Sequence, residues 1–505
     1  MTKDPNVSPR TSHGALLILL AIITLGAALR LASITRESAW GDEALTTACY
    51  PAESFADCMD CVFAEDARLR IAPVYYWVQY AWTLVAGGSL TSLRLLSVFL
   101  SIVTTVQLFN LGRLIAGNTA GLWGTALFNL SLFQIYYGQE VRFYALMNVF
   151  ALAALHGLAL YLRESKLRYL ALCVAGNALL IWTHTFSVVF VFAQGFLLLG
   201  WWKHLRTILP WFTAHGLMAL ALFAWLAFLD YDFAGQSAAY RDMPAGPREL
   251  ANTFLQFAGG RFSNINPAPW MPLGFSADLL IAASTAALAA YALFKSWSKK
   301  VEAAPSPGLS RGEAALLLVA FLGPILGLYL LNWYWRPCFF SRYVVYAALP
   351  LQLLAASGLS ALPRTGLVPR RVAIFILLLF TWQHLALPRP FRADYGELAR
   401  AVANDPSHHR AVIALKPFNF DAAEYALRDQ YVPVELLHGL KEMVAVAQRR
   451  CAAGESVWAV FYRWDDTAAF ERALKDGGAM ITHHRTAGMP PLDLFHVSRG
   501  AGNTE

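Results

Sequence analysis

Long apolar runs are the feature of this sequence that most restricts its fold. A helix needs about 20 apolar residues to cross a bilayer, and the chain holds about eleven runs near that length. The runs cover residues 14–34, 95–112, 119–137, 143–162, 169–184, 186–202, 207–229, 276–296, 313–333, 343–362 and 371–387. Charged residues make up only 14% of the chain, against about 25% in soluble proteins. The sequence therefore predicts a polytopic α-helical membrane protein with about 11 transmembrane helices.

A further apolar stretch, residues 71–87, is rich in tyrosine and tryptophan. These residues favour the membrane–water interface. If this stretch does not cross the membrane, all six lysines before residue 390 fall on the same side, as expected for cytoplasmic loops. We therefore predict a juxtamembrane segment there, with residues 35–94 and 230–275 as outer loops.

The tail has a different composition. Short apolar runs at 410–415, 432–435, 456–462, 480–486 and 493–498 predict strands, and segments at 394–404, 421–428, 440–451 and 467–475 predict helices. Alternating elements indicate a small α/β domain whose last two strands form a hairpin. We expect a transmembrane domain over 1–390 and an extracytoplasmic α/β domain over 391–505. The tail has neither a Gly-rich phosphate loop nor a metal-ligand motif, so we assign it no chemistry.

An acidic pair, Asp42 and Glu43, follows the first apolar run in the stretch Trp40-Gly41-Asp42-Glu43. Carboxylates beside the hydrocarbon indicate chemistry or cation binding, although acidic residues also cap helices at membrane surfaces. The basic residues on the predicted outer side before residue 390 are, histidines apart, all arginine. The arginine fork matches the geometry of phosphate. As a group, these arginines favour an anionic ligand on the face that holds the acidic pair, although any single one can instead be a helix cap.

Cysteines on the predicted outer side permit a disulfide in the first outer loop, because that compartment is oxidising. Cys49 has two partners within reach in the sequence, Cys58 and Cys61. Spacing alone leaves both pairings open.

Four stretches together resemble the membrane glycosyltransferases of the GT-C superfamily, in particular the bacterial family 39 group that includes protein mannosyltransferases and aminoarabinose transferases. The stretches are Trp40-Gly41-Asp42-Glu43-Ala44-Leu45, Ala72-Pro73-Val74-Tyr75-Tyr76, Gln139-Glu140-Val141-Arg142-Phe143-Tyr144-Ala145-Leu146, and Arg342-Tyr343 followed by Leu349-Pro350. The resemblance extends from about residue 14 to residue 390, and more loosely over the tail.

The resemblance implies transfer of a sugar from a polyprenyl-phosphate donor to an acceptor hydroxyl, with inversion at the anomeric carbon. Asp42 is the expected base for the acceptor proton, and Glu43 is the second candidate or shapes the field around Asp42. Arginine forks would stabilise charge on the leaving phosphate, and Arg142 and Arg342 are the best placed by motif. The expected substrate-binding residues are Arg70, Tyr75, Arg94, Glu140, Arg142, Tyr144, His184, Arg336, Arg342 and Tyr343. We expect Glu140 to pair with Tyr144 through helical i, i+4 spacing.

The expected partners are the lipid-linked donor, membrane lipid and a cell-envelope acceptor, which would be a glycan such as lipopolysaccharide, a lipid or a protein; no nucleic acid is expected. The expected location is the bacterial inner membrane, with the active site on the extracytoplasmic side. No cofactor is certain. A divalent cation is compatible with the acidic pair, but Arg70, Ile71 and Ala72 precede Pro73 where the family usually has His or a second acidic residue, which disfavours a tightly held metal.

Three alternatives stay open. A glycan polymerase or ligase would use the same kind of donor, but the acidic pair directly after the first run favours a simple transferase. A transporter or flippase of lipid-linked sugars would need polar groups along a path through the membrane. The apolar runs instead hold few charges, and polar groups gather at the outer ends. An inactive relative serving as a scaffold is the third.

Overall fold

The structure is a computed structural model, and two compact units make up the chain. The described residues are 12–32, 34–35, 37–50, 52–65, 70–200, 204–229, 244–259, 272–298, 309–363, 367–386, 393–407, 409–415, 417–461, 467–486 and 492–499. The helical unit comprises Met1–Leu31, Asp66–Ala81 and Leu95–Leu387, and the sheet unit comprises Ala32–Glu65, Trp82–Arg94 and Pro388–Glu505. Most of the first outer loop thus belongs to the same compact unit as the tail. The division into domains at residue 390 stays a prediction.

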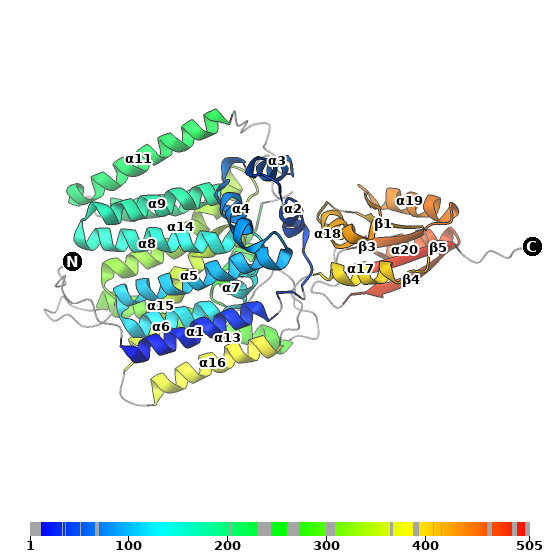
Figure 1. The fold of residues 1–505 in the computed structure, drawn as a ribbon. Helices are drawn as coiled ribbons and strands as arrows, with labels where there is room; N and C mark the ends of the chain where they lie inside the picture. The colour runs from blue at the N-terminus through cyan, green and yellow to red at the C-terminus, as the bar shows by residue number, and fades with distance from the viewer. Residues whose placement is uncertain are drawn as a thin grey trace, which may run out of the picture. The chain divides into compact units, whose positions relative to one another are not determined.

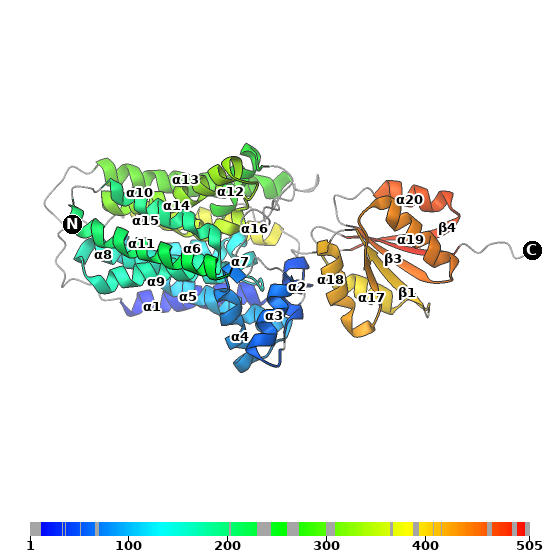
Figure 2. The ribbon, with the colours of Figure 1, turned by 90° about the horizontal axis from the view of Figure 1, so that it is seen from above.

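The helical unit is built from helices that lie side by side (Figures 1 and 2). In chain order they are α1 (His13–Leu31), α5 (Leu90–Ala116), α6 (Asn118–Leu130), α7 (Leu132–Tyr137), α8 (Tyr144–Glu164), α9 (Leu167–Thr183), η2 (Thr185–Ser187), α10 (Val188–Leu199), α11 (Leu205–Phe228), α12 (Pro247–Phe257), α13 (Pro272–Ser298), α14 (Arg311–Tyr334), η4 (Ser341–Ala347), α15 (Ala348–Ser360) and α16 (Val368–Ala386).

Among the described residues, seven helices are long and apolar enough to cross a membrane: α1, α5, α8, α11, α13, α14 and the continuous η4–α15 segment. Three further predicted spans fall on the shorter apolar helices α9, α10 with η2, and α16. The predicted span 119–137 falls on α6 and α7, with Ser131 between them. Every predicted span is thus helical, and the prediction of a polytopic α-helical membrane protein is confirmed.

The predicted juxtamembrane segment forms α4 (Val74–Ala86), a helix of 13 residues. At a rise of about 1.5 Å per residue it is about 20 Å long, which is shorter than the hydrocarbon core of a bilayer. The predicted outer loop 230–275 contains α12, but residues 230–243 and 260–271 lie outside the described residues.

Glycines allow α8 and α9 to pack closely. A Cβ added at Gly157 would lie 2.5 Å from the backbone nitrogen of Cys173, and one at Gly176 would lie 2.7 Å from that of Ala154. Neither helix could hold a larger residue at these points without moving. Small residues at helix–helix contacts are the usual route to tight packing in a membrane, where burial of apolar surface gives little net driving force.

A polar cluster attaches α11 to its neighbours. The side-chain amides of Asn177 and Gln194 exchange hydrogen bonds of 2.9 and 3.0 Å between α9 and α10. Asn177 Nδ2 also lies 2.9 Å from His215 Nε2 of α11. His215 is one of only three buried residues of α11, with Ile208 and Trp211, so these hydrogen bonds add a polar contact to an otherwise exposed helix.

The sheet unit contains a five-stranded sheet in the order β2-β1-β3-β5-β4. β1 (Arg410–Ala414) pairs in parallel with β2 (Val434–Leu436) and β3 (Ser456–Phe461), whereas β5 (Asp493–Arg499) runs antiparallel to both β3 and β4 (Ala479–Arg485). The other elements of this unit are α2 (Gly41–Ala48), α3 (Phe55–Glu65), α17 (Tyr395–Ala403), α18 (Pro417–Leu427), η5 (Arg428–Gln430), α19 (Leu440–Ala452) and α20 (Thr467–Asp476). The predicted α/β tail with a terminal hairpin is confirmed.

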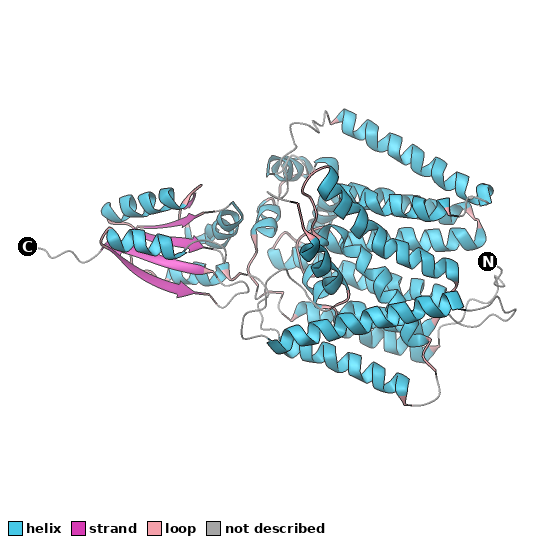
Figure 3. Ribbon diagram, turned by 180° about the vertical axis from the view of Figure 1, so that it is seen from behind, coloured by secondary structure: helices cyan, strands magenta, loops and turns pink. Residues whose placement is uncertain are grey.

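Helices cover both faces of this sheet (Figure 3). The alternation along β3 explains the two layers, because Val457 and Phe461 pack with α19 and α20, while Trp458 and Val460 pack with α17 and α18. Side chains of successive strand residues point to opposite faces, so a strand that is buried throughout serves two cores at once.

A buried carboxylate, Asp405, lies near the start of β3. It accepts hydrogen bonds from the Ser407 backbone nitrogen at 2.9 Å and from Trp458 Nε1 at 2.9 Å, and the Ser456 hydroxyl donates to it as well. Burial by itself would raise the pKa of Asp405, but the hydrogen bonds from Ser456, Ser407 and Trp458 lower it, and the net pKa lies well below the ordinary value.

Candidate active site

The acidic pair lies in the first turn of α2, in the sheet unit. The carbonyl oxygen of Trp40 accepts the backbone N–H groups of Glu43 at 2.8 Å and Ala44 at 2.9 Å, so the helix begins directly at Gly41. Carboxylates in the first turn interact favourably with the positive end of the helix dipole. Asp42 is half-buried, whereas Glu43 is completely buried.

Glu43 forms a buried ion pair with Arg94, which lies in the first turns of α5. The two side chains are 0% and 1% exposed. Arg94 Nε and Nη2 donate to the two carboxylate oxygens of Glu43 at 3.3 and 2.8 Å. A two-point contact of this kind is among the strongest between side chains, because both hydrogen bonds are charge-assisted.

Arg94 also holds the backbone that precedes α2. Its Nη1 donates to the carbonyl oxygens of Ile34 at 2.8 Å and Glu37 at 2.6 Å, and its Nη2 donates to that of Ser38 at 3.0 Å. With the two bonds to Glu43, these contacts use all five N–H donors of the guanidinium.

This geometry changes two of the predicted roles. Arg94 was expected to bind substrate, but its N–H groups are all engaged and its side chain is buried, so it serves to position the acidic loop. Glu43 was the second candidate for the base, but Arg94 neutralises both of its oxygens. Of the two carboxylates, Asp42 is the one that solvent reaches.

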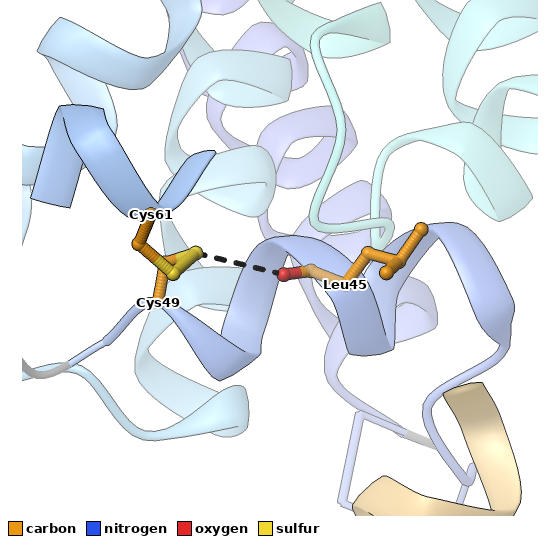
Figure 4. Close-up of a disulfide and its surroundings, with 3 residues drawn as sticks. All are labelled: Leu45, Cys49 and Cys61. Carbon is orange, nitrogen blue, oxygen red and sulfur yellow. Dashed lines mark hydrogen bonds between the residues drawn. A yellow bond between two sulfur atoms is a disulfide. The ribbon is translucent and has the colours of Figure 1, made fainter. Parts of the chain in front are cut away.

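A disulfide joins the end of α2 to α3 (Figure 4). It links Cys49 to Cys61, with a Cα–Cα distance of 5.7 Å, and so selects one of the two pairings that the sequence left open. The Cys49 sulfur lies 3.9 Å from the carbonyl oxygen of Leu45, one turn back in α2. Cys58 is buried as a free thiol. The acidic helix is thus fixed at its start by Arg94 and at its end by the disulfide.

A second group of predicted residues gathers in the helical unit around His184, which lies between α9 and η2. The His184 ring centroid is 4.8 Å from that of Phe143 and 4.6 Å from that of Tyr343. The positive charges of Arg142 and Arg342 both act on this ring. The structure therefore brings together two of the predicted arginines, His184 and Tyr343 from three separate parts of the sequence.

Aromatic rings line this group. Phe186 stacks against Tyr343 at 5.7 Å with an interplanar angle of 16°, and Phe340 contacts Tyr343 edge-on at 5.2 Å. The Arg342 guanidinium lies 4.9 Å from the Phe340 ring centroid, and that of Arg142 lies 5.1 Å from that of Phe143. Such cation–π contacts orient the guanidinium groups. Phe143, Phe186 and Phe340 were not singled out by the sequence reading, because isolated phenylalanines are ordinary in membrane helices.

Glu140 and Tyr144 lie on either side of a helix boundary. α8 begins at Tyr144, and residues 139–143 form a bend rather than a helix. The i, i+4 argument for a Glu140–Tyr144 pair is therefore wrong, because helical spacing does not apply there. Glu140 is completely buried, and its backbone oxygen accepts the Ser97 hydroxyl at 2.5 Å.

The remaining predicted residues of the helical unit have different surroundings. Tyr75 is completely buried in α4 and contacts the rings of Tyr76 at 5.3 Å and Phe143 at 6.3 Å. Arg70 is exposed just before α4. The Arg336 guanidinium lies 4.1 Å from the Trp335 ring centroid at the end of α14. Tyr75 is thus connected through Phe143 to the rings around His184.

Arg30, a buried arginine near the end of α1, was missed by the sequence reading. Its Nη1 donates to the carbonyl oxygen of Gly26 and to Asn129 Oδ1, both at 3.0 Å, and its Nη2 donates to the carbonyl oxygen of Gln134 at 3.4 Å. A Cβ added at Gly138 would lie 2.6 Å from Arg30 Nε. Arg30 therefore fixes the turn from α7 into the bend that holds Glu140 and Arg142. The sequence does contain a signal for Arg30, because a charged residue inside a predicted membrane span usually has a specific partner or function.

Among the described residues, no three His, Cys, Asp or Glu side chains are grouped closely enough to hold a metal ion. Glu43 is poorly suited to bind a metal ion, because Arg94 donates hydrogen bonds to both of its carboxylate oxygens.

One family model and several solved structures match this chain. Residues 71–228 match the family described as dolichyl-phosphate-mannose-protein mannosyltransferase. A search of curated proteins finds no match. The crystal structure of ArnT from Cupriavidus metallidurans in the apo state superposes with a TM-score of 0.56 at 12% identity, over 95% of this chain and 98% of that one. The chain has the GT-C fold.

Two further structures support the same fold. ArnT from Cupriavidus metallidurans bound to undecaprenyl phosphate gives a TM-score of 0.54 at 12% identity, over 95% of this chain and 98% of that chain. The apo oligosaccharyltransferase of Archaeoglobus fulgidus gives 0.50 at 11% identity, over 88% of this chain and 69% of that chain. At these identities the likeness shows the fold alone, and the predicted fold class is confirmed.

Proposed function

We propose that this membrane protein is a glycosyltransferase that moves a sugar from a polyprenyl-phosphate donor to an acceptor hydroxyl. The family match over residues 71–228 supports a sugar carried on a lipid phosphate, because dolichyl phosphate is a polyprenyl-type carrier. The ArnT structure bound to undecaprenyl phosphate supports the same class of donor. No observation favours a transporter or a polymerase.

The reaction is a single displacement. The acceptor oxygen attacks the anomeric carbon, the bond from that carbon to the phosphate oxygen breaks, and the bonding electrons leave with the polyprenyl phosphate. The acceptor hydroxyl loses its proton to a base, and attack from the face opposite the phosphate inverts the anomeric centre. Catalysis therefore needs a carboxylate for the proton and positive charge for the leaving phosphate.

Asp42 is the proposed base. One observation carries this choice: Glu43 is buried and neutralised by Arg94, whereas its neighbour Asp42 is partly exposed at the start of the same helix. Two adjacent carboxylates thus take different roles from their surroundings. A positioned base contributes about 10²- to 10⁴-fold to the rate.

Arg142 and Arg342 are the proposed phosphate-binding groups. Both guanidinium groups lie within electrostatic range of His184 and both lie against aromatic rings, so they bring positive charge to the same part of the helical unit. Donors of this kind stabilise charge that develops on a leaving phosphate. Tyr343 and His184 are proposed to contact the donor, with Arg70 and Arg336 as further basic residues.

We place the reaction at the extracytoplasmic side of a bacterial inner membrane, with a glycan, lipid or protein of the cell envelope as acceptor. The distribution of lysines in the sequence supports this orientation. The carrier lipid would enter from the bilayer.

A donor panel tests the proposal. Purified protein in liposomes would receive several undecaprenyl-phosphate sugars with a membrane extract as acceptor, and mass spectrometry would detect released undecaprenyl phosphate and glycosylated product. We expect consumption of one donor by the native protein. Movement of a labelled donor across the bilayer without release of its sugar would contradict the transferase function and support a transporter.

A further inference from the structure

Ser38, four residues before Asp42, connects the acidic loop to the tail of the chain within the sheet unit. Its hydroxyl donates to Asp394 Oδ1 at 3.1 Å and accepts the backbone N–H of Gly396 at 2.8 Å. Its own carbonyl oxygen accepts Arg94 Nη2 at 3.0 Å. One residue thus bonds both to the arginine that anchors Glu43 and to the beginning of α17.

The tail side of this connection lies at the start of α17. Asp394 caps α17, because its Oδ1 also accepts the backbone N–H of Glu397 at 3.0 Å. A Cβ added at Gly396 would lie 3.3 Å from the Ser38 hydroxyl oxygen and 3.2 Å from Asp394 Oδ1. A side chain at residue 396 would therefore press on both hydrogen-bonded oxygens.

A helix of the tail packs against the acidic helix itself. α18 lies beside α2, as both views show (Figures 1 and 2). On α18, the ring of Tyr425 lies 4.2 Å from the Arg428 guanidinium, and the charges of Arg94 and Glu43 both act on its phenol. The buried ion pair is thus within electrostatic range of the tail as well as in hydrogen-bond contact through Ser38.

We propose that the tail is a positioning element of the transferase, and that Ser38 and Asp394 hold the first turn of α2 so that Asp42 reaches the acceptor hydroxyl. The inference rests on the proposed role of Asp42. Neither Ser38 nor Asp394 touches substrate in this proposal. Their effect is on the rate of the bond-making step, because they fix the backbone that carries the base, and a small displacement of a catalytic group is costly.

The test compares Ser38→Ala with Ser54→Ala in the full-length protein. Ser54 belongs to the same outer loop and also donates to an aspartate, Asp57, at 2.6 Å, but within its own helix cap. We expect Ser38→Ala to lower kcat about tenfold, as for a lost hydrogen bond to a charged group, with the KM for the donor unchanged. Ser38→Thr, which keeps the hydroxyl, should restore most of kcat, and Ser54→Ala should keep native kcat.

Amide hydrogen exchange supplies a second readout, which does not depend on turnover. Ser38→Ala should speed exchange over residues 41–48, and Ser54→Ala should not. If Ser38→Ala does not fold, Gly396→Ala replaces it, because the added Cβ lies 3.3 Å from the Ser38 hydroxyl oxygen and presses on it without deleting it, and we expect a loss of kcat in the same direction but smaller.

Several results would overturn the inference: native kcat in both Ser38→Ala and Gly396→Ala, a raised KM with unchanged kcat, or an equal loss in Ser54→Ala. Asp42→Asn, assayed in parallel, shows whether such a result contradicts only the positioning role of Ser38 or also the proposed role of Asp42 as the base. If Asp42→Asn is inactive and Ser38→Ala is native, only the positioning role is wrong. If Asp42→Asn keeps full activity, the proposed base is wrong.

Discussion

Removing the charge of Glu43 tests whether its ion pair with Arg94 holds the acidic loop. Glu43→Gln leaves the Arg94 guanidinium 1% exposed without the carboxylate that neutralises it. Breaking a buried pair by removing one partner costs about 3–5 kcal/mol. Because the carbonyl oxygens of Ile34, Glu37 and Ser38 still accept three of its N–H groups, we expect the lower end, about 3 kcal/mol.

This loss is measurable by thermal unfolding. For a unit of roughly 150–250 residues, each kcal/mol lowers Tm by about 2–4 °C, so Glu43→Gln should lower the transition by about 6–12 °C. Tryptophan fluorescence of the detergent-solubilised protein would follow it. Arg94→Met should lower Tm further, since it removes five hydrogen bonds. Glu53→Gln, an exposed change in the same loop, is the control. A Glu43→Gln protein with the Tm of the native protein would show that the ion pair with Arg94 does not stabilise the acidic loop.

Three more predictions concern other parts of the molecule. Arg142→Ala should lower kcat/KM for the donor by about 10²- to 10³-fold, while Arg168→Ala, at an exposed position, should leave it native; equal donor consumption by the two variants would contradict the phosphate-binding role. Replacing both Cys49 and Cys61 by serine opens a loop with a sequence separation of 12 and should cost about 3 kcal/mol, seen as a lower Tm under non-reducing conditions; an unchanged Tm would count against the disulfide as a staple. Hydrogen bonds hold the pKa of Asp405 below its ordinary value despite burial, so its stabilising contribution is present above about pH 4, the unfolded pKa, and falls as the pH drops below it. The Tm difference between the native protein and Asp405→Asn should therefore shrink below about pH 4, and a constant difference from pH 7 to pH 3 would contradict this.

Periodicity and length were enough to predict the long apolar helices and the sheet, but not the short helices α2, α3 and α12 of the predicted outer loops. Apolar runs near 20 residues match the thickness of a bilayer, and ten of the eleven predicted spans fell on one continuous helical segment, whereas the span 119–137 is broken at Ser131. In the tail, the strands had strong local signals, because β3 is buried on both faces and reads as a continuous apolar run. The hairpin of β4 and β5 followed from two such runs close together in sequence.

The roles within the acidic pair could not be predicted from the sequence. Asp42 and Glu43 are adjacent and chemically similar, and the difference between them arises from Arg94, which lies 51 residues from Glu43 along the chain. Which carboxylate an arginine neutralises depends on tertiary packing. The same limit applies to Ser38, whose partner Asp394 is 356 residues away.

The pairing of Glu140 with Tyr144 was predicted from helical spacing, but the backbone between these residues is not helical. The apolar runs 119–137 and 143–162 predict a helix on either side of this segment, but residues 139–143 bend. The sequence signal for the bend is Gly138, whose Cβ would meet Arg30. A glycine at this position predicts a bend only when the residue that packs against it, here Arg30, is known.

In the proposed reaction Asp42 takes the acceptor proton, while Glu43 serves as a structural anchor. The most direct measurement is the transfer rate of Asp42→Asn, with Tm determined on the same sample. We predict that kcat falls by at least about 100-fold, that Tm stays within about 1 °C of the native value, and that added donor still binds. A variant that is stable and transfers sugar at the native rate would contradict the account.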